Sequence, residues 1–162
     1  MSREGNGAQA EVGENGPVRT VRLRIASRRE FLDSVHNLSE HLIGEVGFAQ
    51  DDNYWMVTAV REAVTNAVIH GNKETPGTSV DVCFELGDDR IRITVSDQGD
   101  GFDPDSPPDP VSKEHLLDAS GRGVFLMHQL MDEVSYTFPE GGGTTLSMMR
   151  RLRTESPDSE AE

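Results

Sequence analysis

The chain of 162 residues contains a single cysteine, Cys83. One thiol excludes an intrachain disulfide and a thiolate-based metal cluster, and we assign Cys83 no role. The sequence also lacks an apolar run close to the ~18 residues that indicate a membrane span. Its N-terminus does not show the basic-then-apolar pattern of a signal peptide. We therefore expect a cytoplasmic protein that does not contact a membrane.

Basic side chains are scarce. The chain has 15 Lys and Arg against 29 Asp and Glu, which gives a formal net charge of −14 at pH 7. Nucleic-acid binding normally depends on clustered Lys and Arg, so we expect no direct DNA or RNA ligand. A protein partner or a metal-chelated nucleotide fits this charge better.

The two ends of the chain have little apolar content. Residues 1–17 are rich in Gly and Glu, and residues 154–162 are acidic. Such segments cannot offset their ordering entropy by burial, so we predict flexible tails there. The remaining residues 18–153 have the length of one folded domain.

Hydrophobic periodicity predicts a strand and then a helix at the start of this domain. Residues 18–25 alternate apolar and polar side chains over most of their length, as in a half-buried strand. The segment Ser27–Glu30 matches a capping box, which predicts a helix that starts there and ends at Gly44 or Gly47.

A second helix is predicted to begin near Asp51 or Asp52 and to end at residues 70–72, with Gly71 as its C-cap. One apolar stripe marks the face that this helix buries. The stripe consists of Val57, Val60, Val64, Ala67 and Val68.

The second half of the domain reads mostly as strands. Val80, Val82 and Phe84 are expected opposite Ile91, Ile93 and Val95 in a hairpin that turns at residues 87–89. Residues 97–120 predict a binding loop or lid. A helix over 124–131 opening at 121–123, a strand over 134–138 and a strand over 144–149 follow. We expect an α/β two-layer sandwich, with helices on one face of a mixed sheet.

Three polar residues share a face of the second helix. Glu62, Asn66 and His70 recur every four residues, opposite the apolar stripe. A solvated face is the simplest interpretation. Asn is a mediocre helix former, however, and carboxylate and amide oxygens suit a hard cation such as Mg²⁺. The pattern alone leaves both interpretations open.

An Asp and two glycines follow the second strand of the hairpin. Asp97 could accept a hydrogen bond from an exocyclic amine, while Gly99 and Gly101 permit close approach of backbone to a ligand. A plain Asp/Gly turn is the alternative. The spaced acidic ligands of a calcium loop are missing.

Two further glycine-rich segments are weak signals when taken singly. Residues 120–123 open a predicted helix, whose free N–H groups would suit a phosphate. Residues 141–145 would be an ordinary turn into a strand in most sequences.

The four segments together, in this order, resemble a known superfamily. They read REAVTNAVIHGN (61–72), DQGDGF (97–102), SGRGVFLMHQLMDEV (120–134) and GGGTTL (141–146). The chain resembles the gyrase and histidine-kinase ATPases with the Bergerat ATP-binding fold (the GHKL superfamily). Within it, the segments are similar to anti-sigma factor serine/threonine-protein kinases of bacterial partner-switching systems. The resemblance spans residues 18–151.

The resemblance implies roles for individual residues. Glu62 would be the catalytic base that activates a serine or threonine hydroxyl, and Asn66 would be a Mg²⁺ ligand. Asp97 would hold the adenine amino group, with Gly101 beside the base. Thr145 would support Asp97 or a bridging water.

The resemblance also implies phosphate-binding residues at the third segment. Gly121 and Gly123 would offer backbone donors to the phosphates of ATP. Relatives often place a basic residue just before the first of these glycines, whereas this chain has Ala119. Lys113 or Arg122 would then supply the charge at the γ-phosphate.

The implied function is an ATP- and Mg²⁺-dependent kinase that phosphorylates an anti-anti-sigma partner of the STAS type and sequesters a sigma factor. We also expect a homodimer. The alternative is a regulatory module that binds ATP to control protein association and phosphorylates nothing.

Overall fold

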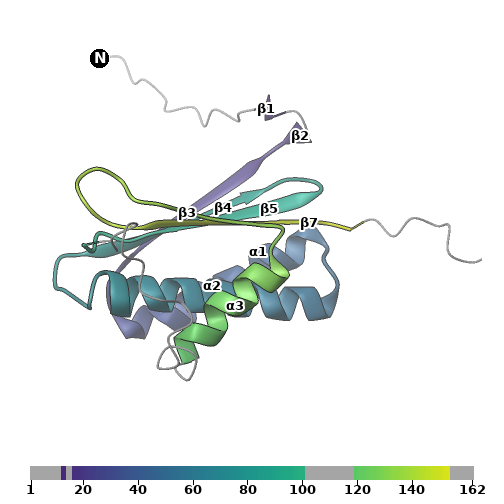
Figure 1. The fold of residues 1–162 in the computed structure, drawn as a ribbon. Helices are drawn as coiled ribbons and strands as arrows, with labels where there is room; N and C mark the ends of the chain where they lie inside the picture. The colour runs from purple at the N-terminus through teal and green to yellow at the C-terminus, as the bar shows by residue number, and fades with distance from the viewer. Residues whose placement is uncertain (1–11, 14–15, 101–118, 154–162) are drawn as a thin grey trace, which may run out of the picture.

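The computed structural model describes residues 12–13, 16–100 and 119–153. In these residues, three α-helices cover one face of a five-stranded sheet, which confirms the α/β two-layer sandwich (Figure 1). The strands of this sheet are β3 (Arg19–Ala26), β4 (Ser79–Leu86), β5 (Arg90–Ser96), β6 (Glu133–Thr137) and β7 (Thr145–Arg151). The helices are α1 (Leu32–Val46), α2 (Gln50–Asn66) and α3 (Ala119–Leu130).

A separate short pairing lies near the N-terminus, inside the segment predicted to be a flexible tail. There β1 (Val12–Gly13) pairs with β2 (Gly16–Pro17). The limits of the folded domain stay a prediction.

The sheet is antiparallel throughout, so the expectation of a mixed sheet is wrong. Its strand order is β3-β4-β5-β7-β6, and each of the four neighbouring pairs runs antiparallel. The connection from β5 through α3 leads to β6, which points in the same direction as β5. Because β7 inserts between them, the two parallel strands never share hydrogen bonds.

The central hairpin has the predicted pairing. Val82 lies opposite Val95, and Phe84 lies opposite Ile93. Alternate residues of β4 and β5 are buried against the helices, as the alternation of apolar and polar side chains predicts. The largest fully buried side chains of the core are Phe84, Ile43, Met56, Leu86, Ile91, Ile93, Met127, Met148 and Met149.

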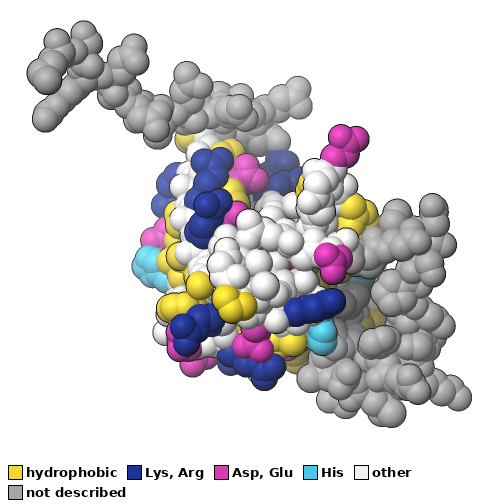
Figure 2. Space-filling model, turned by 90° about the vertical axis from the view of Figure 1, so that its left-hand side faces the viewer, with side chains coloured by type: hydrophobic (Ala, Val, Ile, Leu, Met, Phe, Trp, Pro, Cys, Tyr) yellow, Lys and Arg dark blue, Asp and Glu magenta, His cyan; other side chains and the backbone are white. Residues whose placement is uncertain are grey.

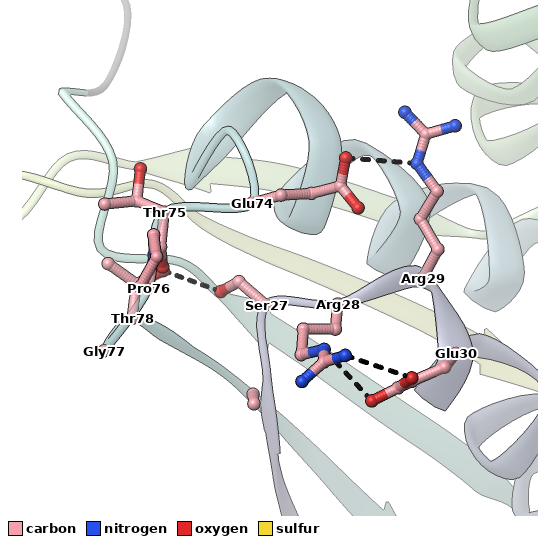
Figure 3. Close-up of a pocket in the computed structure, with 10 residues that line it drawn as sticks. Ser27, Arg28, Arg29, Glu30, Glu74, Thr75, Pro76, Gly77 and Thr78 are labelled. Atoms are coloured by element: carbon pink, nitrogen blue, oxygen red, sulfur yellow. Dashed lines mark hydrogen bonds and ion pairs between the residues drawn. The ribbon is translucent and has the colours of Figure 1, made fainter.

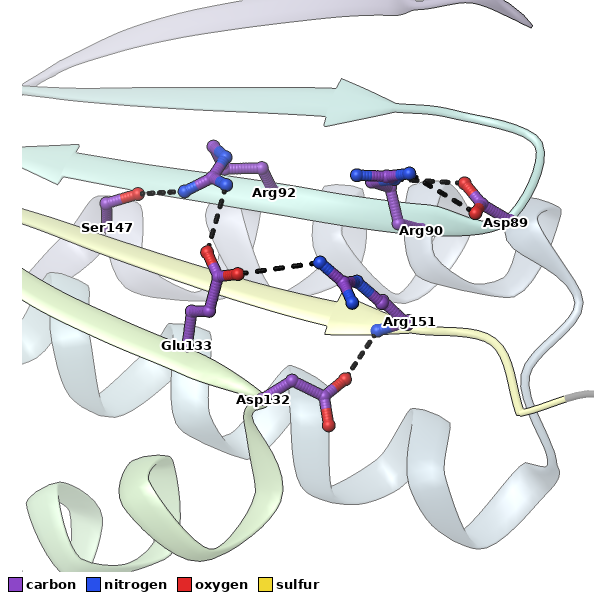
Figure 4. A network of polar contacts seen from close by, with 7 residues as sticks. All are labelled: Asp89, Arg90, Arg92, Asp132, Glu133, Ser147 and Arg151. Carbon is purple, nitrogen blue, oxygen red and sulfur yellow. Dashed lines mark hydrogen bonds and ion pairs between the residues drawn. The ribbon is translucent and has the colours of Figure 1, made fainter. Parts of the chain in front are cut away.

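The other face of the sheet carries exposed ion pairs in place of helices (Figure 4). Arg92 and Arg151 both reach the Glu133 carboxylate, at 3.2 Å and 3.6 Å. Arg92 also donates a hydrogen bond to the Ser147 hydroxyl at 3.2 Å. Exposed ion pairs contribute little to stability. The polar residues that alternate along the strands are polar because this face of the sheet meets solvent.

The helix α1 does not start with the predicted capping box. A 3₁₀ turn (η1, Arg29–Phe31) precedes it, and no side chain caps either segment. The Ser27 hydroxyl is buried and is used elsewhere, because it accepts a hydrogen bond from Asn72 Nδ2 at 2.7 Å. The predicted end is correct, since Gly47 caps α1 with φ of 96°.

The helix α2 continues into a π-helical turn, η2 (Ala67–Gly71). The predicted apolar stripe of this helix is buried. The predicted C-cap is wrong, because Asn72 follows the turn with φ of −80° and Gly71 has no left-handed φ. Gly71 is required for another reason: a Cβ there would overlap the Asp97 carboxylate.

The helix α3 starts at Ala119, two residues earlier than predicted, so residues 121–123 are its third to fifth residues. Buried Arg150 of β7 donates to the Leu130 carbonyl at 2.6 Å and pairs with Asp52 at 3.3 Å. It thereby joins the end of α3 to the start of α2.

Most of the predicted lid lies outside the described residues, together with Gly101 and Lys113. None of the described helices combines the length and apolar character needed to cross a bilayer.

Candidate nucleotide-binding site

Asp97 lies where β5 ends, beside the turn that leads into β7. Its backbone N–H donates to the Thr144 carbonyl at 3.0 Å. Its Oδ1 accepts hydrogen bonds from the N–H groups of Gly99 at 3.0 Å and Thr144 at 3.2 Å. No described residue donates to Oδ2. The carboxylate therefore keeps one acceptor oxygen for a ligand donor such as an amine.

Burial raises the pKa of the Asp97 carboxyl, and the two backbone hydrogen bonds act in the opposite direction. The ionised form is thus held by the amides of Gly99 and Thr144 in a partly desolvated place. A hydrogen-bond donor from a ligand would stabilise the same form further.

Glycines allow three backbone segments to meet at Asp97. A Cβ at Gly99 would overlap the Gly71 carbonyl, and a Cβ at Gly143 would overlap the Asp97 carbonyl. Gly143 also has φ of 94° and donates to the Gly99 carbonyl at 2.6 Å. The close approach predicted for Gly99 is therefore made to the chain's own π-helical turn.

A buried asparagine that the sequence analysis did not single out supports this corner. Asn72 Nδ2 donates to the Ser79 carbonyl at 2.9 Å as well as to Ser27. Its Oδ1 accepts from the Gln98 N–H at 2.7 Å, and Gln98 Oε1 accepts from the Ser79 N–H at 2.8 Å. Asn72 is the last residue of the segment 61–72 on which the family resemblance rests, but its hydrogen-bond partners lie outside that segment, so the sequence did not indicate its role.

Thr145 does not contact Asp97 in the structure. Its hydroxyl lies 2.9 Å from Ser96 Oγ on the open face of the sheet. The backbone of Thr144 makes the contacts with Asp97. Sequence reasoning missed Thr144 because a backbone contact carries no side-chain signature.

Glu62 and Asn66 occupy one turn near the end of α2. Glu62 is half-buried, and this burial raises the pKa of its carboxyl, while neighbouring Arg61 lowers it. No described residue forms a hydrogen bond or ion pair with Glu62. A raised pKa closer to neutral improves a carboxylate as a general base.

The Asn66 side chain presents an oxygen without a partner. Its Oδ1 is buried and accepts no hydrogen bond from the described residues. A buried polar atom is costly unless something satisfies it. An amide oxygen beside a carboxylate matches the oxygen ligands that Mg²⁺ prefers, so the residues present fit this cation.

His70 does not extend this pair. It is exposed and lies in the π-helical turn, where hydrogen bonds span five residues rather than four. The four-residue spacing that aligns Glu62 with Asn66 therefore ends at Asn66. Gly121, Arg122 and Gly123 are the third to fifth residues of α3. In a helix that starts at Ala119 the N–H of Gly121 has no intrahelical acceptor and can meet an anion, whereas the N–H of Gly123 faces the Ala119 carbonyl.

The loops at this end of the molecule expose much backbone. Figure 2 views the molecule from the left-hand side of Figure 1, where the turn between β6 and β7 lies, and shows a broad area of backbone and uncharged side chains. Charged side chains surround that area. A ligand here would meet mainly backbone groups and few fixed charges.

The hollow drawn in Figure 3 is a different place. It measures about 570 Å³ and is lined by residues 26–30 and 74–78. Arg28 and Arg29 are neutralised by Glu30 at 3.0 Å and by Glu74 at 3.1 Å. Glu62, Asn66 and Asp97 do not line it, so we do not place the nucleotide there.

The comparisons with known proteins identify the family of the chain. The family model described as "Histidine kinase-like ATPase domain" matches residues 15–150. The serine-protein kinase RsbW of Staphylococcus epidermidis is 32% identical over 154 residues, covering 88% of this chain and 92% of its own length. RsbW of Staphylococcus aureus (strain JH9) is 32% identical over 149 residues with the same coverage.

Two solved structures share the fold. The RsbU and RsbW domains of Rv1364c from Mycobacterium tuberculosis match with a TM-score of 0.57 and 22% identity, over 86% of this chain and 34% of that one. The histidine kinase domain of the Erythrobacter litoralis EL346 blue-light activated histidine kinase matches with a TM-score of 0.50 and 20% identity, over 76% of this chain and 60% of that one. The chain belongs to the histidine kinase-like ATPase domain family and, within it, groups with the RsbW serine-protein kinases.

Proposed function

We propose that this chain is an anti-sigma factor serine/threonine kinase that uses Mg-ATP to phosphorylate a STAS-type anti-anti-sigma protein. It sequesters a sigma factor when that partner is not available, acts as a homodimer and has no nucleic-acid ligand. The observation that carries the proposal is the pair on the last turn of α2. There a half-buried carboxylate with a raised pKa stands beside a buried amide oxygen without a partner.

Each residue has a distinct task in this reaction. Asp97 Oδ2 accepts a hydrogen bond from the exocyclic amine of adenine, which selects ATP over GTP. The free N–H groups at the start of α3, that of Gly121 among them, bind the phosphates, and the missing side chain of Gly123 allows their close approach. Arg122 or Lys113 provides positive charge at the γ-phosphate. Gly101, which lies outside the described residues, would be next to the adenine, as the family resemblance implies.

The chemical step is an in-line transfer to a hydroxyl of the partner. The Glu62 carboxylate accepts the proton of the serine or threonine hydroxyl while the hydroxyl oxygen bonds to the γ-phosphorus. The bond from the γ-phosphorus to the β,γ-bridging oxygen breaks, and ADP leaves. Asn66 Oδ1 would hold Mg²⁺, which neutralises phosphate charge when bound. Most of the rate enhancement then comes from positioning and electrostatics rather than from covalent chemistry.

Glu62→Gln separates binding from chemistry. The variant is expected to bind ATP as the wild type does and to transfer phosphate ~10²–10⁴-fold more slowly, as for a lost general base. Labelled ATP and purified STAS-domain proteins provide the assay, with Glu40→Gln on the exposed side of α1 as the matched control. Transfer by Glu62→Gln at the wild-type rate would overturn the role of Glu62. Absence of transfer by the wild type to any STAS-domain protein would favour a module that binds ATP without catalysis.

A further inference from the structure

Two neighbouring aromatic residues are exposed on the first turns of α2. Tyr54 is 65% exposed and Trp55 is 40% exposed. Their rings stand edge to face, with centroids 5.1 Å apart and planes at 76°. Both side chains point away from the core, which the next two residues, Met56 and Val57, enter. Tyr and Trp are among the residue types most enriched in binding hot spots. Two adjacent exposed aromatic side chains are therefore more typical of a binding surface than of a helix face that meets only solvent.

Trp55 and Glu62 lie on the same face of α2, and Tyr54 borders that face, about 80° around the helix from Glu62. Trp55 and Glu62 are seven residues apart, which is two helical turns and ~10 Å along the axis. Thr58, between them, is only partly buried. This part of α2 is regular, because the π-helical turn begins only after Asn66.

A folded protein that brings a hydroxyl to Glu62 must cover this face. A typical interface buries ~800 Å² on each partner, a patch roughly 30 Å across. A point ~10 Å from the reacting hydroxyl lies well inside such a patch. The helices form a layer on one side of the sheet (Figure 1). A partner that approaches the outer surface of this layer therefore does not meet the sheet.

We propose that Tyr54 and Trp55 form the docking patch for the phosphoacceptor protein; this inference rests on the proposed function. The occupant is the acceptor, because the patch continues the same helix face that carries the catalytic base. A second copy of this chain docked there would block access to Glu62.

The charges around the patch define the matching surface of the acceptor. Arg61 is paired with Asp33 at 3.3 Å, and the Asp33 side chain is 82% exposed. Asp51 is also exposed, one turn before Tyr54. The acceptor is therefore expected to present an apolar centre that receives the two rings, bordered by Lys or Arg.

The test compares the double variant Tyr54→Ser/Trp55→Ser with the wild type in three assays. The first measures phosphate transfer to a purified STAS-domain protein that the wild type phosphorylates. The second measures transfer to a short peptide carrying the acceptor serine. The third measures ATP binding by thermal shift. Controls are Arg22→Ser, an exposed position on the open face of the sheet, and the conservative variant Trp55→Phe.

We expect the double variant to raise KM for the folded acceptor at least ~10-fold, the loss typical of truncating hot-spot residues. Its kcat, its transfer to the peptide and its ATP binding should match the wild type, as should Arg22→Ser in every assay. Trp55→Phe, which keeps an aromatic ring, should leave the KM for the folded acceptor close to the wild-type value.

Other outcomes overturn the proposal. An unchanged KM for the folded acceptor removes the docking patch and leaves the proposed function intact. An equal loss with the peptide or in ATP binding shows that the pair acts through the fold. Light scattering of both proteins adds a fourth readout: a dimeric wild type and a monomeric double variant would identify the patch as a contact between copies and overturn the proposal. A wild type that phosphorylates no STAS-domain protein overturns the proposed function, and the docking patch with it.

Discussion

Asp97 and Glu62 are two carboxylates whose pKa values are both raised by burial, yet their surroundings are built differently. Asp97 is held by two backbone N–H groups and stands in a corner where glycines let three segments touch. Among the described residues, none donates a hydrogen bond to Glu62 and none satisfies the Asn66 oxygen beside it. The corner proposed to recognise the base is preorganised by the chain itself, whereas the proposed catalytic turn carries polar atoms that the described residues do not satisfy.

The largest effect is expected from filling the preorganised corner. In Gly99→Ala the new methyl group would overlap the Gly71 carbonyl, and backbone cannot turn aside as a side chain could. We expect the free energy of unfolding to fall by about 3 kcal/mol, at the upper end of overpacking costs. The thermal shift that ATP produces should also disappear.

Gly44→Ala is the matched control for this substitution. A Cβ at Gly44 meets nothing within 4 Å, and the residue lies inside α1. Alanine there should stabilise the protein by roughly 0.5–1 kcal/mol and leave ATP binding unchanged. Denaturation of both variants with and without ATP decides the matter. A Gly99→Ala protein with wild-type stability would show that the backbone around Asp97 can move to accept a methyl group, and would contradict the close packing of this corner.

Asn72→Ala is expected to act next most strongly. It leaves the partly buried Gln98 N–H and Ser79 carbonyl without their partner, which should cost about 2–3 kcal/mol of unfolding free energy. ATP affinity should fall as well, because Gln98 directly follows Asp97. Asn37→Ala, at an exposed position of α1, is the control and should change stability by no more than about 0.5 kcal/mol. Loss of stability with unchanged ATP affinity would separate the Asn72 network from the site.

Asp97→Asn tests recognition of the base. ATP at a hundredfold excess over its Kd stabilises a native protein by about 2.7 kcal/mol. Replacing the carboxylate acceptor by an amide should remove about 1.5–3 kcal/mol of binding free energy, and thus most of this thermal shift. Asp100→Asn is the control, because the Asp100 side chain is 97% exposed. Equal ATP-induced shifts in wild type and Asp97→Asn, or an equal response to GTP, would contradict the assignment.

The smallest effect is a pH dependence at Glu62. Its pKa is raised above the ordinary value of 4.5, so the folded state holds this proton more tightly than the unfolded state. Ionising Glu62 therefore destabilises the fold as pH rises above 4.5 toward the folded pKa. Glu62→Gln should raise Tm relative to wild type at pH 8, and this gain should shrink toward pH 5. The activity of the wild type should rise over the same range, because the base must be ionised.

A Tm difference that does not change with pH would contradict the raised pKa. Glu40→Gln provides the baseline, since Glu40 is exposed on α1.

The local parts of the fold could be predicted from the sequence because their causes are local. The alternation in β4 and β5 and the apolar stripe of α2 each reflect one buried face. The order of the four glycine and polar segments was enough to indicate the ATPase fold. The sequence carries no local signal for which distant strands pair, so the position of β7 between β5 and β6 was not predicted.

The errors at single residues have the same origin. Ser27 has the sequence context of a helix cap, but Asn72 lies 45 residues away and uses its hydroxyl. Gly71 has the context of a C-cap, but its lack of a Cβ makes room for Asp97. Thr144 acts through its backbone, which no residue type reveals. In each case a contact across the fold decided the role of the residue.

The position of β7 between β5 and β6 has a consequence for how the protein is made. Because β7 fills the gap between β5 and β6, a growing chain cannot complete its sheet until residues 145–151 have been synthesised. Until then one edge of β5 has unpaired backbone N–H and C=O groups, and alternate residues of the strand are Ile or Val. Such an edge can pair with strands of other chains and cause aggregation. Nascent or truncated chains that stop before Thr145 should therefore aggregate or require a chaperone, whereas chains that stop just after Arg151 should fold.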